Sequence, residues 1–111
     1  HVGMSEPADV AMRMFDKYPN LYADTSFREN DIYADGALDP AWEKVVRKHH
    51  KRLMIGSDTW VNGQWAIYDA IIDINRKWLA LLPREVAENI AYKNAERMFG
   101  RTMDMSLIGT K

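Results

Sequence analysis

One short stretch ends in side chains that could do chemistry. Residues 53–57 are apolar or small, and Asp58, Thr59 and Trp60 follow them directly. Ligands of α/β proteins lie at the carboxyl ends of parallel strands, so a carboxylate there could bind a divalent cation or take a proton from a metal-activated water. Gly56 would let backbone or ligand come close. The alternative is that residues 57–59 form a polar turn, and spacing alone does not decide between the two.

A second set of polar side chains lies in and after the stretch 20–27. Apolar and polar residues alternate there, which predicts a strand. Asp24 would either face a polar interior or cap a neighbouring backbone group, and we favour the cap. Arg28 and Glu29 follow the strand end, where substrate contacts are often found. A surface loop is the simpler expectation for both, and Arg28 is kept as a candidate substrate-binding residue.

Histidine is the common metal ligand, and the chain has three of them. His49 and His50 end a predicted helix, where cations suit the helix dipole, so we expect surface residues. His1 is a candidate for the site if it ends a strand. A catalytic metal needs about three protein ligands, and the sequence offers Asp58 and His1. From the residues alone, this is half of a possible site.

The four tryptophans divide into two pairs. Trp42 and Trp78 fit the apolar faces of predicted helices and are expected in the core. Trp60 and Trp65 flank the loop after Asp58 and could wall a pocket or pack the loop, with packing the simpler expectation. Trp60 is kept as a candidate substrate-binding residue.

Alternating helices and strands must position these side chains. The predicted order is a helix over 6–17, a strand over 20–27, a loop over 28–38, a helix over 40–49, a strand over 52–57, a helix over 64–81, a helix over 83–92, a turn over 94–99 closed by Gly100, and a tail over 101–111. This order predicts an α/β fold with a parallel sheet. Two or three strands cannot close a barrel, which takes about 250 residues, so the chain is expected to be part of something larger.

Composition excludes several classes of partner and site. The 111 residues suit a single domain, and the net charge is -1, with 15 basic and 16 acidic residues. We therefore expect neither nucleic acid nor a membrane as a partner. The absence of cysteine excludes disulfides and thiolate sites. A cytoplasmic location is expected.

Four segments, taken in order, resemble a known family. They are HVG at 1–3, YPNLYADTS at 18–26, RLMIGSDT at 52–59 and LPREVAENIAYKNAERMFG at 82–100. Together they resemble the C-terminal part of the amidohydrolase-related (amidohydrolase 2 type) metal-dependent TIM-barrel hydrolases. The resemblance implies that residues 1–111 are a C-terminal fragment of a single barrel domain. It would hold about strands six to eight of a (β/α)8 barrel with the following helices, incomplete as given.

The resemblance also implies an active site. His1 would end the sixth strand near metal and substrate, and Asp58 would end the eighth as metal ligand or general base. The reaction would be hydrolysis of a C–N or C–O bond in a small molecule through a metal-activated water, with zinc the expected divalent metal. The family's H-x-H motif and its fifth-strand histidine have no counterpart in this sequence. We therefore expect the fragment to be inactive alone, and to self-associate or to contact the missing part of the barrel.

Two alternatives remain open. Similar barrels decarboxylate aromatic acids through the same metal site, so a metal-dependent decarboxylase is one. A non-catalytic interaction module is the other, supported by the aromatic residues and the missing ligands.

Overall fold

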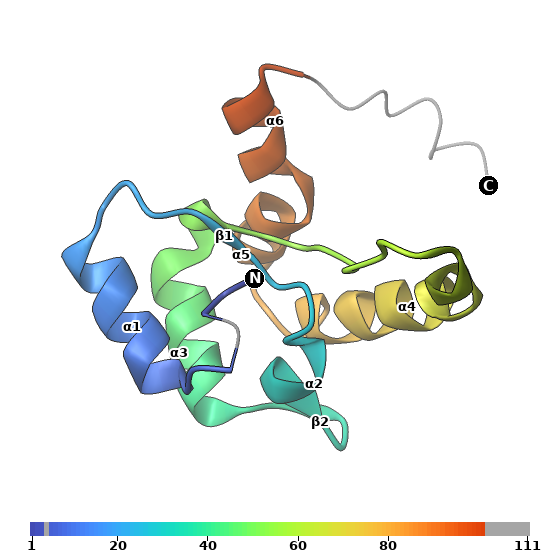
Figure 1. Cartoon of the computed structure of the whole chain (residues 1–111). Coiled ribbons are helices and arrows are strands. Elements are labelled where there is room, and N and C mark those ends of the chain that lie inside the picture. The colour runs from blue at the N-terminus through green and yellow to red at the C-terminus, as the bar shows by residue number, and fades with distance from the viewer. Residues whose placement is uncertain (4, 102–111) are drawn as a thin grey trace.

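The computed structural model describes residues 1–3 and 5–101 as a mixed α/β structure in which helices predominate (Figure 1). The elements are α1 (Ala8–Lys17), β1 (Ala23–Asp24), α2 (Glu29–Ile32), β2 (Tyr33–Ala34), β3 (Ala37–Leu38), α3 (Pro40–His49), the 3-10 helix η1 (His50–Arg52), β4 (Leu53–Met54), the 3-10 helix η2 (Asn62–Ile67), α4 (Tyr68–Leu79), α5 (Arg84–Glu88), the π-helical η3 (Asn89–Lys93) and α6 (Asn94–Phe99).

The predicted parallel pairing is confirmed, but the strands are much shorter than predicted. β1 pairs with β4 in parallel, with Asp24 opposite Met54. The backbone N–H of Thr25 donates to the Met54 carbonyl at 2.8 Å, and the ladder ends there. Ile55 N–H donates instead to the carbonyl of Ile90 at 3.3 Å, in the π-helical turn. The chain after β4 is therefore attached to a helix rather than to β1.

Residues 28–38 are not the loop that the sequence predicted. They form α2 and an antiparallel hairpin in which Tyr33 lies opposite Leu38. Asp35 and Gly36 form its turn with φ angles of 54° and 80°. Two consecutive positive φ angles are typical of the type I′ turns that close two-residue hairpins.

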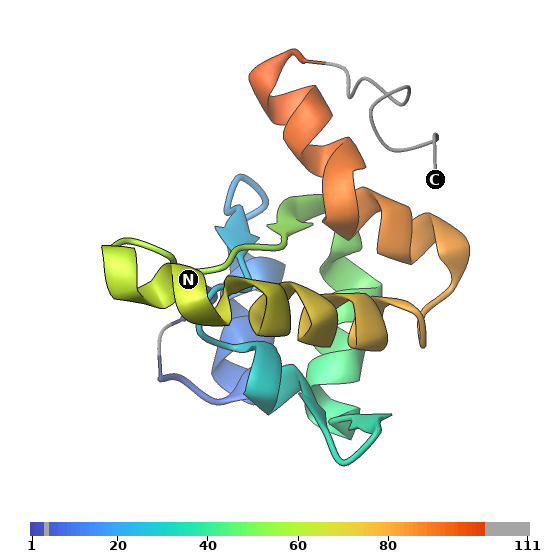
Figure 2. The ribbon, with the colours of Figure 1, turned by 90° about the vertical axis from the view of Figure 1, so that its right-hand side faces the viewer.

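The core lies where α1, α3, β4 and the C-terminal half of α4 meet. Figures 1 and 2 show α1 and α3 side by side, and α4 packs against α2. Trp42 and Trp78 are 5% and 0% exposed, which confirms their predicted place in the core. The indole N–H of Trp78 donates to Asn75 Oδ1 at 2.9 Å, so this buried polar atom is satisfied. Among the helices of the described chain, none is long and apolar enough to cross a lipid bilayer.

The prediction that His49 is a surface residue is wrong. Its side chain is only 7% exposed and stacks on Phe15, with ring centroids 5.3 Å apart. Its Nε2 lies 2.8 Å from Asp16 Oδ1, and its Nδ1 lies 2.8 Å from the guanidinium of Arg52. His50 is half-buried as well. His49 packs on Phe15 and His50 Nδ1 lies 2.9 Å from Asn89 Nδ2, so both rings contact other parts of the chain.

The C-terminal helices hold the start of β4 in place. The buried amide of Asn94 donates to the carbonyls of His50 at 2.6 Å and Leu53 at 2.7 Å. α6 then ends at Gly100, with φ 66°, as predicted. The predicted tail lies outside the described residues, except for Arg101.

Candidate functional site

His1, Asp24 and Asp58 meet beside the ends of β1 and β4. His1 Nε2 lies 3.2 Å from Asp58 Oδ1, and His1 Nδ1 lies 3.6 Å from Asp24 Oδ1. The three side chains are 27%, 41% and 29% exposed, so all are half-buried and open to a ligand. The structure thus brings together the two residues predicted to be catalytic, and adds Asp24 on the other side of the imidazole ring.

Close packing behind the site depends on a glycine. Asp24 Oδ1 accepts a hydrogen bond from the backbone N–H of Ser26 at 2.9 Å, which confirms that this carboxylate caps a backbone group. A Cβ at Gly56 would overlap Ser26 Oγ and come within 3.2 Å of Asp24 Oδ1. The absence of a side chain at Gly56 therefore lets the segment before Asp58 pass directly beside the segment after β1.

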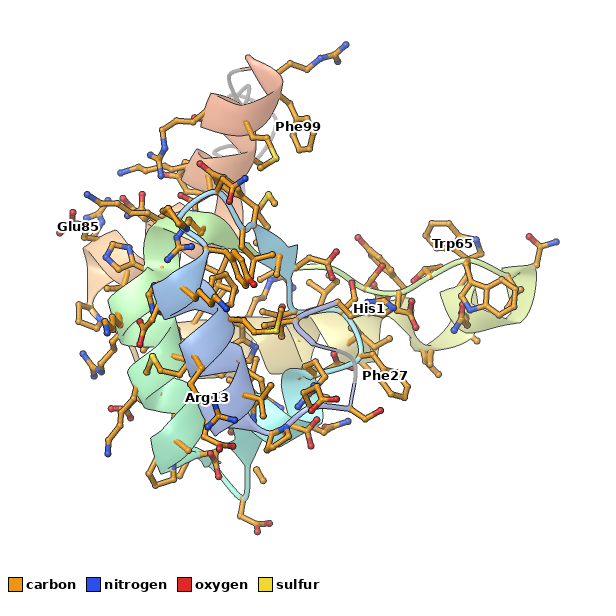
Figure 3. All side chains as sticks on the ribbon, turned by 60° about the vertical axis from the view of Figure 1, so that its left-hand side comes forward. His1, Arg13, Phe27, Trp65, Glu85 and Phe99 are labelled. Atoms are coloured by element: carbon orange, nitrogen blue, oxygen red, sulfur yellow. The ribbon has the colours of Figure 1, made fainter. Side chains whose placement is uncertain are left out.

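The backbone is unusual at two positions of the site. Phe27 and Asp58 have φ angles of 67° and 55°, in the left-handed region. Aspartate tolerates this region, but a bulky residue such as phenylalanine is strained there, by about 1–3 kcal/mol. The Phe27 ring is 66% exposed and its centroid lies 6.4 Å from that of His1 (Figure 3). Backbone strain of this kind is concentrated at functional sites.

A cavity of about 560 Å³ opens beside Asp58, between α2 and α4. Glu29 and Asp31 contribute carboxylates to its wall, and Ile67 of η2 and Ile71 of α4 contribute apolar side chains. Its volume suits a small-molecule ligand. Sequence reasoning placed Glu29 in a surface loop and so missed it, whereas the residue is only 8% exposed.

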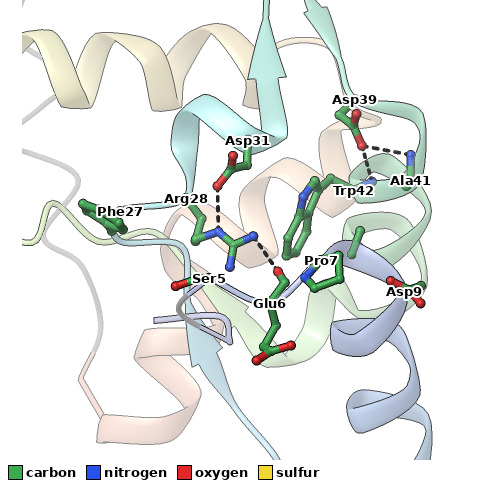
Figure 4. Close-up of a pocket in the computed structure, with 11 residues that line it drawn as sticks. Ser5, Glu6, Pro7, Asp9, Phe27, Arg28, Asp31, Asp39, Ala41 and Trp42 are labelled. Carbon is green, nitrogen blue, oxygen red and sulfur yellow. Dashed lines mark hydrogen bonds and ion pairs between the residues drawn. The ribbon is translucent and has the colours of Figure 1, made fainter.

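The prediction of a surface loop is also wrong for Arg28, which is 4% exposed. Its guanidinium donates to Asp31 Oδ2 at 2.8 Å and to the backbone carbonyls of Val2 at 3.2 Å and Glu6 at 2.7 Å. It also lies 4.7 Å from the centre of the Trp42 ring. Arg28 borders a second cavity, of about 610 Å³, where it ties the first residues of the chain to α2 and α3 (Figure 4). Its predicted substrate contact stays a prediction.

The prediction that Trp60 and Trp65 pack the loop after Asp58 is wrong. Their side chains are 78% and 63% exposed. Figure 3 shows Trp65 on a segment that projects away from the body of the protein, and its ring contacts Tyr68, with centroids 5.4 Å apart. Trp60 does not border the 560 Å³ cavity as the described residues form it, and its predicted substrate contact stays a prediction.

The donor types near Asp58 suit a metal, but their number does not complete a site. Imidazole nitrogen and carboxylate oxygen are both zinc ligands, and a catalytic zinc takes three protein ligands. Across residues 1–3 and 5–101, no group of three or more His, Cys, Asp or Glu side chains is placed to hold a metal ion. His1 and Asp58 therefore fit part of a metal site, and the described residues do not form a whole one.

The comparison with protein families supports the family named in the sequence analysis. Residues 1–101 match the family described as Amidohydrolase. Searches of curated proteins and of solved structures found no match. The family match spans nearly all of the chain and indicates a hydrolase-type or related function. The chain belongs to the amidohydrolase family.

Proposed function

We propose that this chain supplies one part of the active site of a metal-dependent hydrolase that cleaves a C–N or C–O bond in a small molecule. The observation that carries the proposal is the 3.2 Å approach of His1 Nε2 to Asp58 Oδ1 beside the ends of two parallel strands. The family match supports the reaction class, and the adjacent cavity supports a small-molecule substrate.

Hydrolysis requires a base that takes a proton from water and an acid that protonates the leaving group. Asp58 suits the first role, because its carboxylate borders the cavity and is partly open to solvent. Both ring nitrogens of His1 face carboxylate oxygens, which only accept hydrogen bonds. When no metal is bound to it, the His1 ring can donate an N–H to Asp58 and so orient that carboxylate.

When bound, a divalent cation such as zinc would lower the pKa of the attacking water. Asp58 and His1 are the residues that would hold it, with further ligands from outside the described residues. Asp58 borders the cavity that would hold the substrate, and Asp24 lies on the other side of the His1 ring, with its Oδ1 3.6 Å from His1 Nδ1. The family generally uses divalent metals, which supports this assignment.

We also propose that β1 and β4 are two neighbouring strands of a (β/α)8 barrel, and that these 111 residues are its C-terminal part. The parallel β1–β4 pair, with α2 and α3 between its strands in sequence, supports this placement. Within the described part of the chain, that pair is the whole of the parallel sheet, so both outer edges are open to further strands.

The test compares the 111-residue chain with the complete reading frame that encodes it, on a panel of lactones, esters and amides with added zinc. We expect hydrolysis by the longer protein and far less by the chain alone. Asp58→Asn should lower the longer protein's rate by about 100-fold or more. Asp9→Asn is the matched control, because Asp9 is exposed on α1 and pairs only with Arg13 among the contacts described.

The products decide between the alternatives. Hydrolysis adds water to the substrate, whereas decarboxylation releases carbon dioxide, which would favour a decarboxylase of the same family. Full catalytic activity of the Asp58→Asn protein would contradict the role of Asp58. If the longer protein forms neither product, an interaction module is favoured instead.

A further inference from the structure

The cavity between α2 and α4, here called the α2–α4 cavity, has one acidic and one apolar wall. Glu29, Asp31 and Asp58 contribute carboxylates, and Ile67 and Ile71 line the side formed by η2 and α4. The cavity lies directly beside the His1–Asp58 pair, so a molecule bound in it would touch the proposed base.

Glu29 carries an oxygen atom in this wall that has no hydrogen-bond partner among the described residues. The residue is 8% exposed, and its Oε2 atom is buried without a hydrogen bond from any described residue. Asp31 differs, because its Oδ2 accepts a hydrogen bond from Arg28 at 2.8 Å. A buried carboxylate oxygen without a donor is unfavourable, so the Glu29 side chain is suited to a donor that a ligand brings.

The charge of the cavity wall points to the sign of that ligand. The described side chains that border the α2–α4 cavity include three carboxylates and no lysine, arginine or histidine. Attraction between opposite charges strengthens where water is partly excluded, so a cation is favoured there over an anion.

We propose that the α2–α4 cavity is the substrate pocket, and that Glu29 selects substrates with an amino or other cationic hydrogen-bond donor group. The apolar part of the substrate would pack on Ile67 and Ile71. This inference rests on the proposed hydrolase function and specifies its substrate class: small amine-bearing molecules rather than carboxylates.

Two small probes of opposite charge test the proposal on the unmodified chain. Phenethylamine and 3-phenylpropanoate share the phenyl ring and the two-carbon linker. Titrations followed by the methyl NMR signals of Ile67 and Ile71 should show that the amine binds about tenfold more tightly or better. Equal binding of the two probes, or tighter binding of the carboxylate, would overturn the proposal.

A variant at Glu29 tests the assignment to that residue. Glu29→Gln keeps the size of the side chain and removes its charge, so the affinity for phenethylamine should fall about tenfold and the preference over 3-phenylpropanoate should shrink. Glu85→Gln is the control, because Glu85 is exposed on α5 and distant from the α2–α4 cavity (Figure 3). Retention of the full preference by Glu29→Gln would contradict the role of Glu29. If Glu29→Gln does not fold, the comparison of the two probes on the unmodified chain still tests whether the cavity prefers a cationic ligand.

The inference about Glu29 and the proposed hydrolase function can be contradicted independently of each other. Hydrolysis that depends on Asp58, together with equal binding of the two probes, overturns the Glu29 inference and leaves the hydrolase. Selective binding of the amine without any hydrolysis by the longer protein supports the pocket and overturns the hydrolase.

Discussion

His1 Nε2 lies 3.2 Å from Asp58 Oδ1, although the two residues belong to distant parts of the chain. The contact joins the segment before α1 to the segment after β4. It therefore depends on the parallel register of β1 and β4 and on the close passage of Gly56 beside Ser26. The following predictions test the packing that supports this contact and the chemistry that it serves.

Gly56→Ala should destabilise the protein by about 1–3 kcal/mol, because the new methyl group would overlap Ser26 Oγ and crowd Asp24. Gly63→Ala is the matched control, since a Cβ there meets nothing within 4 Å and should change stability by less than about 1 kcal/mol. Urea unfolding measures both. Adding Ser26→Gly to Gly56→Ala should restore part of the loss. Equal stability of the two single variants would contradict the close packing behind the site.

Arg28→Met should lower the free energy of unfolding by about 2–4 kcal/mol, because it removes the buried hydrogen bonds to the carbonyls of Val2 and Glu6. Arg13→Met, at an exposed ion pair with Asp9, should cost less than about 1 kcal/mol. Chemical denaturation separates the two cases. If Arg28→Met were as stable as the unmodified protein, the structural role of Arg28 would be contradicted.

Acidification should destabilise the fold through His49. The Arg52 guanidinium only donates, so His49 Nδ1 must accept, and Nε2–H donates to Asp16. The folded state therefore holds the neutral ring, and burial lowers the pKa of His49 below its ordinary value of 6.5. On acidification the unfolded chain takes up the proton first. The stability contribution is complete above the unfolded pKa and is lost progressively as the pH falls through it toward the lower folded value.

Unfolding free energies measured from about pH 7.5 to about pH 5.5 check this sign. The loss of stability over that interval should be smaller in His49→Gln than in the unmodified protein. Burial lowers the pKa of His50 as well, so the variant should keep part of the pH dependence. A protein that becomes more stable on acidification would contradict the assignment of a neutral, buried His49.

Trp60→Ser and Trp65→Ser should leave the stability within about 0.5 kcal/mol of the unmodified chain, because both side chains are largely exposed. Trp78→Ala, at a fully buried position, should cost about 3–5 kcal/mol. If the exposed aromatic rings drive the self-association that is expected of the isolated chain from its sequence, the two serine variants should also associate more weakly in sedimentation equilibrium. Unchanged association would mean that the surface through which the chains associate does not include Trp60 and Trp65.

Local sequence signals predicted the helices whose ends are marked by capping residues, proline or glycine. The Asp39 side chain accepts hydrogen bonds from the backbone N–H groups of Ala41 and Trp42, and Pro40 occupies the first turn, so α3 begins where the sequence indicated. The parallel pairing of β1 and β4 also followed from the order of the elements. The strand lengths could not be predicted, because the N–H of Ile55 donates to a carbonyl of a distant helical segment, and no local sequence pattern indicates that contact.

Burial set by distant segments could not be predicted in this way. Glu29 and His49 are polar and lie beside predicted element ends, which is typical of surface residues, yet other parts of the chain cover both. The hairpin is a different case, because its Asp35-Gly36 pair is a recognised turn signal. Strands of only two residues show no alternation beside that pair, and the segment was therefore predicted to be a loop.

The most direct test of the central claim, that His1 and Asp58 act together on the substrate, is a double-mutant cycle on kcat in the protein encoded by the complete reading frame. His1→Asn and Asp58→Asn should each lower kcat by about 100-fold or more, and the double variant should lose little beyond the worse single variant, because residues that act as one unit are not additive. Unchanged rates in the single variants, or losses that simply multiply in the double variant, would contradict the account.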